Sequence, residues 1–121
     1  MSKEISCGID FGTSNSAVSI ADKNGVRLVP IEKGQTTLPS SIFFGDGSTF
    51  FGREAIQAYL LGDDGRLLRG LKSILGTELM KEKTRIGRKS ISFIDVLTVY
   101  IKHLKEKSEK YAGAYVKEPI P

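Results

Sequence analysis

The beginning of the chain constrains the fold most, because two alternating runs flank a short polar segment. Residues 5–10 alternate apolar with small or polar side chains, which predicts a strand. Residues 11–15 (Phe-Gly-Thr-Ser-Asn) interrupt this pattern, and a second alternating run follows at residues 18–20. Asn24-Gly25 is a strong hairpin signal, and residues 26–31 continue into a third strand. We therefore expect an antiparallel meander of three strands joined by two tight turns.

The middle of the chain predicts a second hairpin and a short helix. Residues 34–39 are typical of a loop, and residues 42–44 and 49–51 read as two strands around a glycine-containing turn. Apolar residues within 55–60 fit one face of a helix, which the segment 62–65 (Gly-Asp-Asp-Gly) ends. This order of elements indicates that strands come first and helices later.

Leucines and isoleucines within residues 67–75 predict a second helix that stops at Gly76, although Gly70 inside it weakens the helix. Residues 77–91 are polar and basic, with a short hairpin expected around Gly87. The sequence therefore predicts a helix followed by a hairpin in this part of the chain.

The clearest helix begins after Ser92, a typical capping residue, with Asp95 in its first turn. Apolar residues recur along it at steps of three and four: Ile94, Leu97, Ile101 and Leu104. We expect the helix to reach Tyr111 or Ala112 and to stop at Gly113. His103 lies on this helix without a second metal ligand nearby, so we expect it on the surface.

Length and composition fit one globular domain. The chain has 121 residues, of which 40% are hydrophobic and 26% charged, both ordinary values. No apolar run approaches the ~18 residues that a membrane span needs, and the N-terminus lacks the features of a signal peptide. The single cysteine, Cys7, cannot form an internal disulfide and is expected in the core. These features favour a reducing, cytoplasmic setting with no membrane association.

Positive charge is concentrated in the second half of the chain. Residues 61–121 carry 13 basic and 8 acidic side chains, against 5 and 6 in residues 1–60. Between Arg66 and Lys89 there are eight cations and only two carboxylates. Such a cluster could bind a nucleic acid, an acidic lipid or the phosphates of a small ligand, or it could be a solvated basic face.

The turn after the first strand carries the chemistry. Asp10 stands at the exposed end of that strand, where a carboxylate can face a divalent cation or its water shell. Gly12 lets the backbone turn sharply and approach a ligand closely. Groups that could converge on phosphate oxygens are the N–H groups of Gly12, Thr13 and Ser14 and the hydroxyls of Thr13, Ser14 and Ser16. An ordinary β-turn with only local hydrogen bonds is the alternative.

Residues 9–16 (Ile-Asp-Phe-Gly-Thr-Ser-Asn-Ser) resemble the first phosphate motif of the seventy-kilodalton heat-shock chaperones, which are part of the actin and sugar-kinase ATPase superfamily. Further segments resemble the same family in the same order, at residues 38–42, 51–55, 71–76 and 111–113. The resemblance thus extends over nearly the whole chain and suggests a divergent, bacterial-type member.

The resemblance implies roles for individual residues. Asp10 would coordinate the Mg²⁺ of ATP or ADP, through water. Four residues would line the phosphates: Gly12, Thr13, Ser14 and Asn15. Lys72 falls where the family keeps a lysine that points at the γ-phosphate and orients the attacking water. Asp10 and Lys72 are therefore the expected catalytic residues.

The resemblance also implies an α/β fold of the ribonuclease-H-like, actin-like ATPase type. Residues 1–121 would form an incomplete, N-terminal part of the ATPase domain: the start of lobe I with its peripheral helical subdomain. In the full-length protein, ATP hydrolysis would drive assistance to protein folding, with unfolded clients and co-chaperones as partners. We expect the chain alone to hydrolyse ATP negligibly, and an unpaired sheet edge to favour self-association.

Two other functions stay open at the level of sequence. A sugar or acetate kinase of the same superfamily shares the Asp-x-Gly-Thr hairpin at residues 10–13. A basic nucleic-acid-binding module would use the cations between Arg66 and Lys89. The chaperone resemblance favours ATP as the ligand and no nucleic acid.

Overall fold

A computed structural model describes residues 6–23, 25–112 and 119–120. The first sheet contains five strands: β1 (Ser6–Phe11), β2 (Asn15–Asp22), β3 (Gly25–Leu28), β4 (Leu38–Pro39) and β10 (Pro119–Ile120). β1, β2 and β3 are neighbours in an antiparallel meander, β4 pairs with β2, and β10 runs parallel to β1. The predicted meander is therefore confirmed; Asn24, expected in its second turn, lies outside the described residues.

The third strand is shorter than the sequence predicts. β3 ends at Leu28, whereas the expectation extended to Ile31. Pro30 cannot donate a hydrogen bond to a strand ladder. The chain therefore leaves the sheet, and Val29 and Ile31 turn into the core, where they are almost fully buried.

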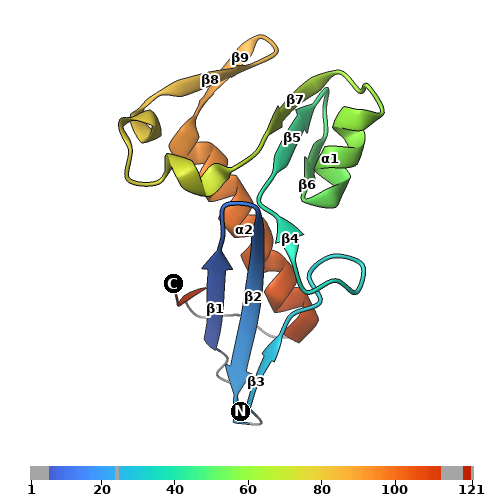
Figure 1. The fold of residues 1–121 in the computed structure, drawn as a ribbon, viewed down its shortest axis with the longest axis vertical. Helices are drawn as coiled ribbons and strands as arrows, with labels where there is room; N and C mark the ends of the chain where they lie inside the picture. Colours follow the sequence, from blue (N-terminus) through green and yellow to red (C-terminus); the bar gives the residue numbers. More distant parts are fainter. Residues whose placement is uncertain (1–5, 24, 113–118, 121) are drawn as a thin grey trace.

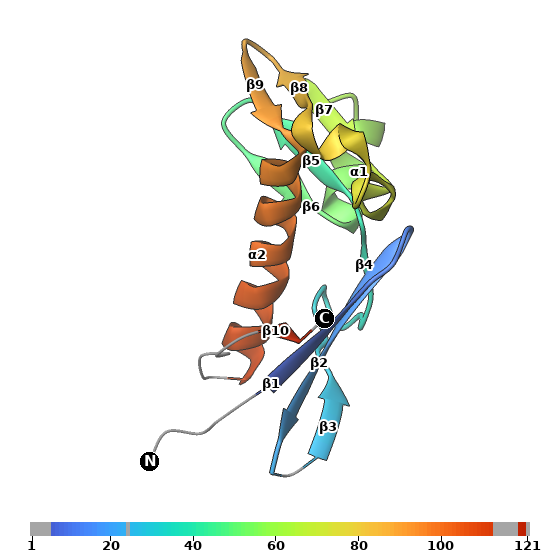
Figure 2. The same cartoon turned by 90° about the vertical axis from the view of Figure 1, so that its left-hand side faces the viewer.

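The helix α2 (Phe93–Ala112) packs against the first sheet, beside which it runs in Figures 1 and 2. The main core lies between them and includes Cys7, as predicted, together with Val18, Ile20, Tyr100 and Leu104. At the helix start, the N–H of Asp95 donates to Ser92 Oγ at 3.1 Å, so the predicted cap is confirmed. The expected stop at Gly113 lies outside the described residues.

The second sheet has the order β6-β5-β7, formed by β5 (Ile42–Gly45), β6 (Thr49–Phe51) and β7 (Gly65–Leu68). The helix α1 (Arg53–Leu60) packs against it through Ala55 and Ala58, which contact Phe43 in a small second core. The predicted second hairpin and the short helix are both confirmed.

The predicted helix over residues 67–75 is wrong. Leu67 and Leu68 belong to β7, where they pair with Phe43 and Ile42 of β5. Gly70 then adopts a left-handed conformation (φ 61°), and only a short 3-10 helix, η1 (Leu71–Ile74), follows. The apolar run pairs with a strand more than twenty residues earlier, a contact that local periodicity does not encode.

A second 3-10 helix, η2 (Glu78–Lys81), leads into the hairpin of β8 (Lys83–Ile86) and β9 (Lys89–Ser92). The hairpin expected around Gly87 is confirmed, and Gly87 lies in its two-residue turn with a φ of 61°. Neither helix within the described residues is long and apolar enough to cross a membrane.

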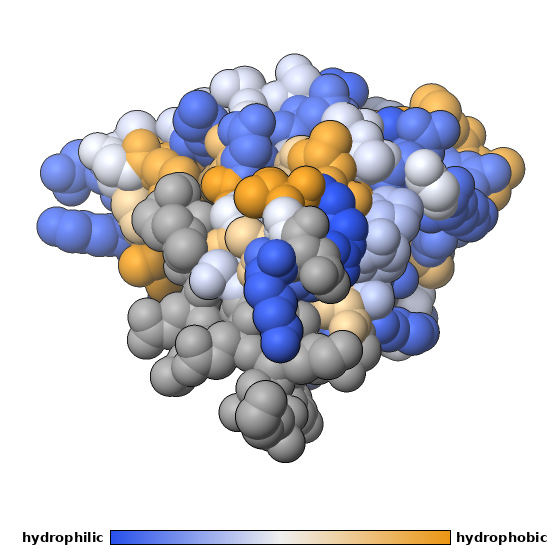
Figure 3. All heavy atoms as spheres, turned by 90° about the horizontal axis from the view of Figure 1, so that it is seen from below, coloured by the Kyte–Doolittle hydropathy of each residue, from blue (hydrophilic) through white to orange (hydrophobic). Residues whose placement is uncertain are grey.

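The two edge strands of the first sheet are β3 on one side and β10 on the other. Within the described part of the chain, no strand pairs with the outer edge of β3. Val26 and Leu28 of β3 are 74% and 53% exposed, and apolar side chains are visible at this end of the molecule (Figure 3). At the other side, β10 pairs with β1 at Cys7 and Gly8. Self-association through an open edge stays a prediction.

Candidate functional site

The turn between β1 and β2 is closed by a hydrogen bond from the Gly12 N–H to the Asn15 carbonyl oxygen at 3.0 Å. A Cβ atom at Gly12 would collide with that same oxygen, so only glycine fits. The Gly12 N–H is therefore not available to a phosphate, contrary to the sequence prediction. Among the described residues, no backbone carbonyl accepts from the N–H of Thr13 or Ser14, and both residues are exposed.

Asp10 lies on the face of β1 that points away from the main core. It pairs with Ala17, whereas its neighbour Ile9 pairs with the buried Val18. Side chains alternate between the two faces of a strand, and Asp10 shares its face with Gly8 and other small residues. Asp10 is exposed and makes no ion pair or side-chain hydrogen bond within the described part of the chain. Its carboxylate is therefore accessible to a ligand.

Ser16, a predicted phosphate contact, is instead buried and structural. Its side chain shares the core face of the sheet, and its hydroxyl is hydrogen-bonded to the Ser40 hydroxyl at 2.8 Å. Ser40 Oγ also donates to the Gly12 carbonyl oxygen at 2.8 Å, and the Ser40 N–H donates to the Ser14 carbonyl oxygen at 2.9 Å. Ser40 thus supports the turn from beneath, a role that the sequence pattern did not reveal.

Tyr100 of α2 supports the same region from the core. Its fully buried hydroxyl donates to the Pro39 carbonyl oxygen at 3.0 Å, with the Leu38 carbonyl oxygen at 3.3 Å. Its ring stacks on Phe11, with centroids 5.6 Å apart. Burial raises the pKa of this hydroxyl above 10.0, against the opposing effect of the Ser16 and Ser40 hydroxyls. α2 is therefore tied to the end of β1 and to β4, which pairs with the start of β2.

The apolar face of α2 differs slightly from the predicted one. Leu97 and Leu104 are buried as expected, but Tyr100 and not Ile101 lies at the centre of this face. Ile94 is 48% exposed. Tyr100 lies three residues after Leu97 and four before Leu104, so the helical spacing also fits it. It is absent from the predicted apolar face because its side chain carries a polar hydroxyl.

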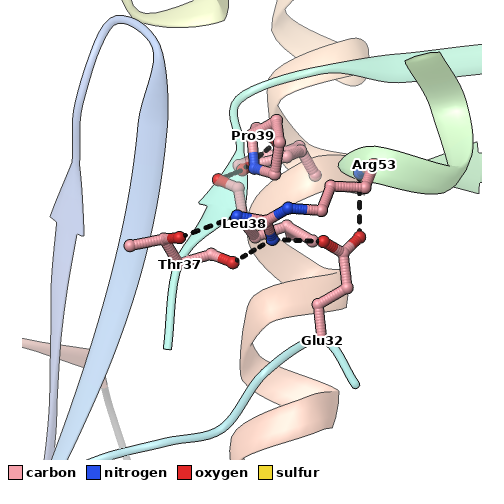
Figure 4. Close-up of polar contacts among 6 residues, drawn as sticks. Glu32, Thr37, Leu38, Pro39 and Arg53 are labelled. Atoms are coloured by element: carbon pink, nitrogen blue, oxygen red, sulfur yellow. Dashed lines mark hydrogen bonds and ion pairs between the residues drawn. The ribbon is translucent and has the colours of Figure 1, made fainter. Parts of the chain in front are cut away.

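An ion pair between the exposed Arg53 and the buried Glu32 fixes the start of α1 to the loop before β4. The Glu32 carboxylate accepts from the Arg53 N–H at 2.8 Å and from Arg53 Nη1 at 2.5 Å, and its side chain is only 7% exposed. The guanidinium also donates to the Thr37 carbonyl and hydroxyl oxygens (Figure 4). Gly52, which precedes α1, has no side chain to cap the helix. Glu32 supplies this cap from a distant loop.

His103 is half-buried, contrary to the surface position that the sequence predicts. Its ring stacks on Phe51, with centroids 3.8 Å apart and planes 8° apart. Burial lowers the pKa of His103 below 6.5, and Lys107 adds to this effect, while Glu106, Glu32 and Glu54 oppose it. The two rings border a cavity of about 250 Å³.

Lys72 lies on η1, is exposed and forms no salt bridge with a described residue. In both Figure 1 and Figure 2, the turn between β1 and β2 points toward the segment that contains η1. The fold therefore brings the elements of Asp10 and Lys72 to the same part of the molecule, although they are far apart in sequence.

No group of three or more histidine, cysteine, aspartate or glutamate residues converges on a metal position among the described residues. Magnesium differs from zinc in this respect, because it often binds through one or two carboxylates, with water and substrate phosphates as the other ligands. The exposed Asp10 carboxylate and the free N–H groups of Thr13 and Ser14 are the kinds of group that such a magnesium ion and its phosphate ligands need.

The fold and the turn define an α/β protein whose first hairpin presents a glycine-containing polar turn and an accessible aspartate. The family model described as "Hsp70 protein" matches residues 6–106. The chain belongs to the Hsp70 family, as the sequence motifs indicate.

Several bacterial relatives match nearly the whole chain. The protein named "Chaperone protein DnaK" of Thermosipho melanesiensis is 30% identical over 98% of this chain. The proteins of the same name from Mycoplasmopsis agalactiae and Metamycoplasma hominis are 28% and 26% identical over 99% of it. The chain spans only about a fifth of the length of these relatives (19–20%). The matched family and the relatives named here are Hsp70 proteins and not the sugar or acetate kinases that the sequence left open as an alternative.

Proposed function

We propose that residues 1–121 are the N-terminal part of an actin-like ATPase domain in a cytoplasmic chaperone. The domain binds ATP and ADP with Mg²⁺, and ATP hydrolysis in the full-length protein assists protein folding together with co-chaperones. The observation that carries this proposal is the turn at residues 11–15, which leaves the N–H groups of Thr13 and Ser14 and the Asp10 carboxylate accessible. Family membership supports the nature of the ligand.

In this proposal, different residues of the turn bind the phosphates and the magnesium ion of a nucleotide. The N–H groups of Thr13 and Ser14 donate to phosphate oxygens, and their dipoles favour the negative charge. Gly12 allows the close approach, because it has no Cβ atom. The Asp10 carboxylate accepts hydrogen bonds from water bound to Mg²⁺. Magnesium, when bound, neutralises charge on the phosphates.

Lys72 acts on the terminal phosphate. A cation at this position stabilises the charge that spreads over the transferring phosphoryl group, and most of the catalysis of such reactions lies in positioning and electrostatic stabilisation. Lys72 has no salt bridge with a described residue that would have to break first. We expect Lys72→Ala in the full-length protein to lower turnover far more than ATP affinity; an equal loss of both would make Lys72 a positioning residue.

Magnesium ADP titrated into the isotopically labelled chain tests the binding site. We expect the backbone amide resonances of Thr13 and Ser14 to shift with saturation at high nucleotide concentration, and Asp10→Asn to weaken the magnesium-dependent part. Asp46→Asn is the matched control, because Asp46 is also an exposed aspartate beside a hairpin turn. Equal binding by the two variants, or shifts located away from the turn, would contradict the proposal.

A further inference from the structure

The β8–β9 hairpin carries a basic surface on one of its two faces. Lys83 and Arg85 are exposed, whereas Thr84 between them is buried, so the two cations share the outward face. Arg66 of β7 lies beside them at the outer edge of β8, where its Nη1 donates to the Arg85 carbonyl oxygen at 3.1 Å. None of these three cations forms a salt bridge within the described part of the chain. We call Arg66, Lys83 and Arg85 the basic face.

The opposite face of the same hairpin has a different charge environment. Lys89 pairs with Ile86, and both border a hollow of about 570 Å³ that is also lined by Asp46 and Asp64. The cations at the hairpin tip therefore share a hollow with two carboxylates. On the basic face, by contrast, Lys83 and Arg85 pair across the hairpin with serines, Ser92 and Ser90. In the register of the two strands, the cations with no carboxylate on their own face are Lys83 and Arg85.

The outer edge of β9 has a free main-chain position at Ser90. A two-residue turn makes the closing pair, Ile86 and Lys89, a hydrogen-bonded pair, and hydrogen-bonded and non-hydrogen-bonded pairs alternate along an antiparallel ladder. Arg85 and Ser90 are therefore a non-hydrogen-bonded pair whose backbone groups point outward. The hydrogen bond from Arg66 Nη1 to the Arg85 carbonyl oxygen confirms that this carbonyl points away from β9.

Nothing in the described part of the chain occupies the Ser90 edge. Ser90 is exposed, and no backbone group outside the hairpin is hydrogen-bonded to it. The hairpin projects from the top of the molecule in Figure 1. An extended peptide can add to such an edge through main-chain hydrogen bonds, while side chains at alternate positions give specificity.

The chemistry of the surface favours a polypeptide over a nucleic acid. Residues 65–92 contain no Phe, Tyr or Trp, so no aromatic platform is available for stacking of bases. A nucleic acid also cannot use the outward N–H and carbonyl groups of Ser90 as a strand would. We propose that the β8–β9 hairpin binds an extended acidic polypeptide, which pairs with the outer edge of β9 and directs carboxylates toward the basic face.

A fluorescent peptide in which glutamate alternates with threonine tests this proposal by anisotropy, without any nucleotide. Lys83→Gln with Arg85→Gln should weaken binding about tenfold, because exposed ion pairs contribute up to about 1 kcal/mol each. Arg88→Gln with Lys89→Gln removes the same charge from the tip and should change affinity less than about twofold. Rising salt should weaken binding to the wild-type chain.

Ser90→Pro tests whether binding needs main-chain pairing with β9 or only the positive charge of the basic face. Proline removes the outward N–H and leaves the basic face unchanged, so we expect peptide binding to be lost, while amide spectra report whether the variant is folded. If Ser90→Pro does not fold, slower hydrogen exchange of the Ser90 amide in the peptide-bound wild-type chain provides the second measurement.

Three results would overturn the proposal. Equal losses in the two double variants would show that the hairpin binds through net charge alone. Unchanged exchange at Ser90 would exclude strand addition. Tighter binding of a single-stranded oligonucleotide than of the acidic peptide would make the basic face a nucleic-acid site.

Discussion

Tyr100→Phe is the sharpest test of how the site is held in place, because it removes one hydroxyl and leaves the ring. Tyr100 is fully buried, and its hydroxyl donates to the Pro39 carbonyl oxygen at 3.0 Å. The net value of such a hydrogen bond is about 1 kcal/mol, and a stranded carbonyl adds to the loss. Pro39 is only half-buried, so water can partly replace the donor. We expect a loss of about 1.5 kcal/mol in the free energy of unfolding.

Thermal and urea unfolding followed by circular dichroism measure this loss. For a chain of this size, about 1.5 kcal/mol corresponds to a fall of roughly 6 °C in Tm. Tyr111→Phe is the matched control, because Tyr111 is 45% exposed on the same helix, and its removal of a hydroxyl should leave Tm unchanged. If the two variants unfold at the same temperature, the Tyr100 hydroxyl does not stabilise the segment beneath the turn.

Two further predictions concern His103 on α2 and Gly52 at the start of α1. The pKa of His103 is lowered in the folded chain, so the unfolded state binds more protons and stability falls as pH drops through 6.5 and below. His103→Gln should reduce the difference between unfolding free energies measured at neutral and mildly acidic pH, and an unchanged difference would contradict this. Gly52→Ala should cost about 2 kcal/mol or more, because Gly52 has a φ of 63° and a Cβ there would meet Leu38 and Glu32. Gly47→Ala, with a φ of 79° but open space, should cost less in the same urea titration.

Local sequence patterns predicted most of the elements correctly. The first meander, the hairpin of β5 and β6, the helices α1 and α2 and the hairpin around Gly87 all follow from alternation, helical spacing and glycine positions. These signals are reliable because each depends on residues that are neighbours along the chain. The predicted helix over residues 67–75 is the exception. Its first two residues, Leu67 and Leu68, lie in β7, and an apolar run this short fits a strand or a helix equally well.

The candidate site was predicted only in part. The exposure of Asp10, Thr13 and Ser14 agrees with the sequence interpretation, and their roles toward a nucleotide stay predictions. The hydrogen bond that uses the Gly12 N–H, and the burial of Ser16, depend on how the turn closes and which face of the sheet meets α2. No single-residue signal distinguishes a hydroxyl that faces a ligand from one that faces the core.

The sequence by itself determined the strand–turn–strand unit, the position of Gly12 in its turn, the cap of α2 at Ser92 and the family to which the motifs point. Only the tertiary structure decided that Ser40 and Tyr100 support the turn, and that Glu32 caps α1 across more than twenty residues. The physical reason is the range of the interactions. Turn geometry and side-chain alternation are set by adjacent residues, whereas a buried hydroxyl or carboxylate finds its partner only when distant segments have packed together.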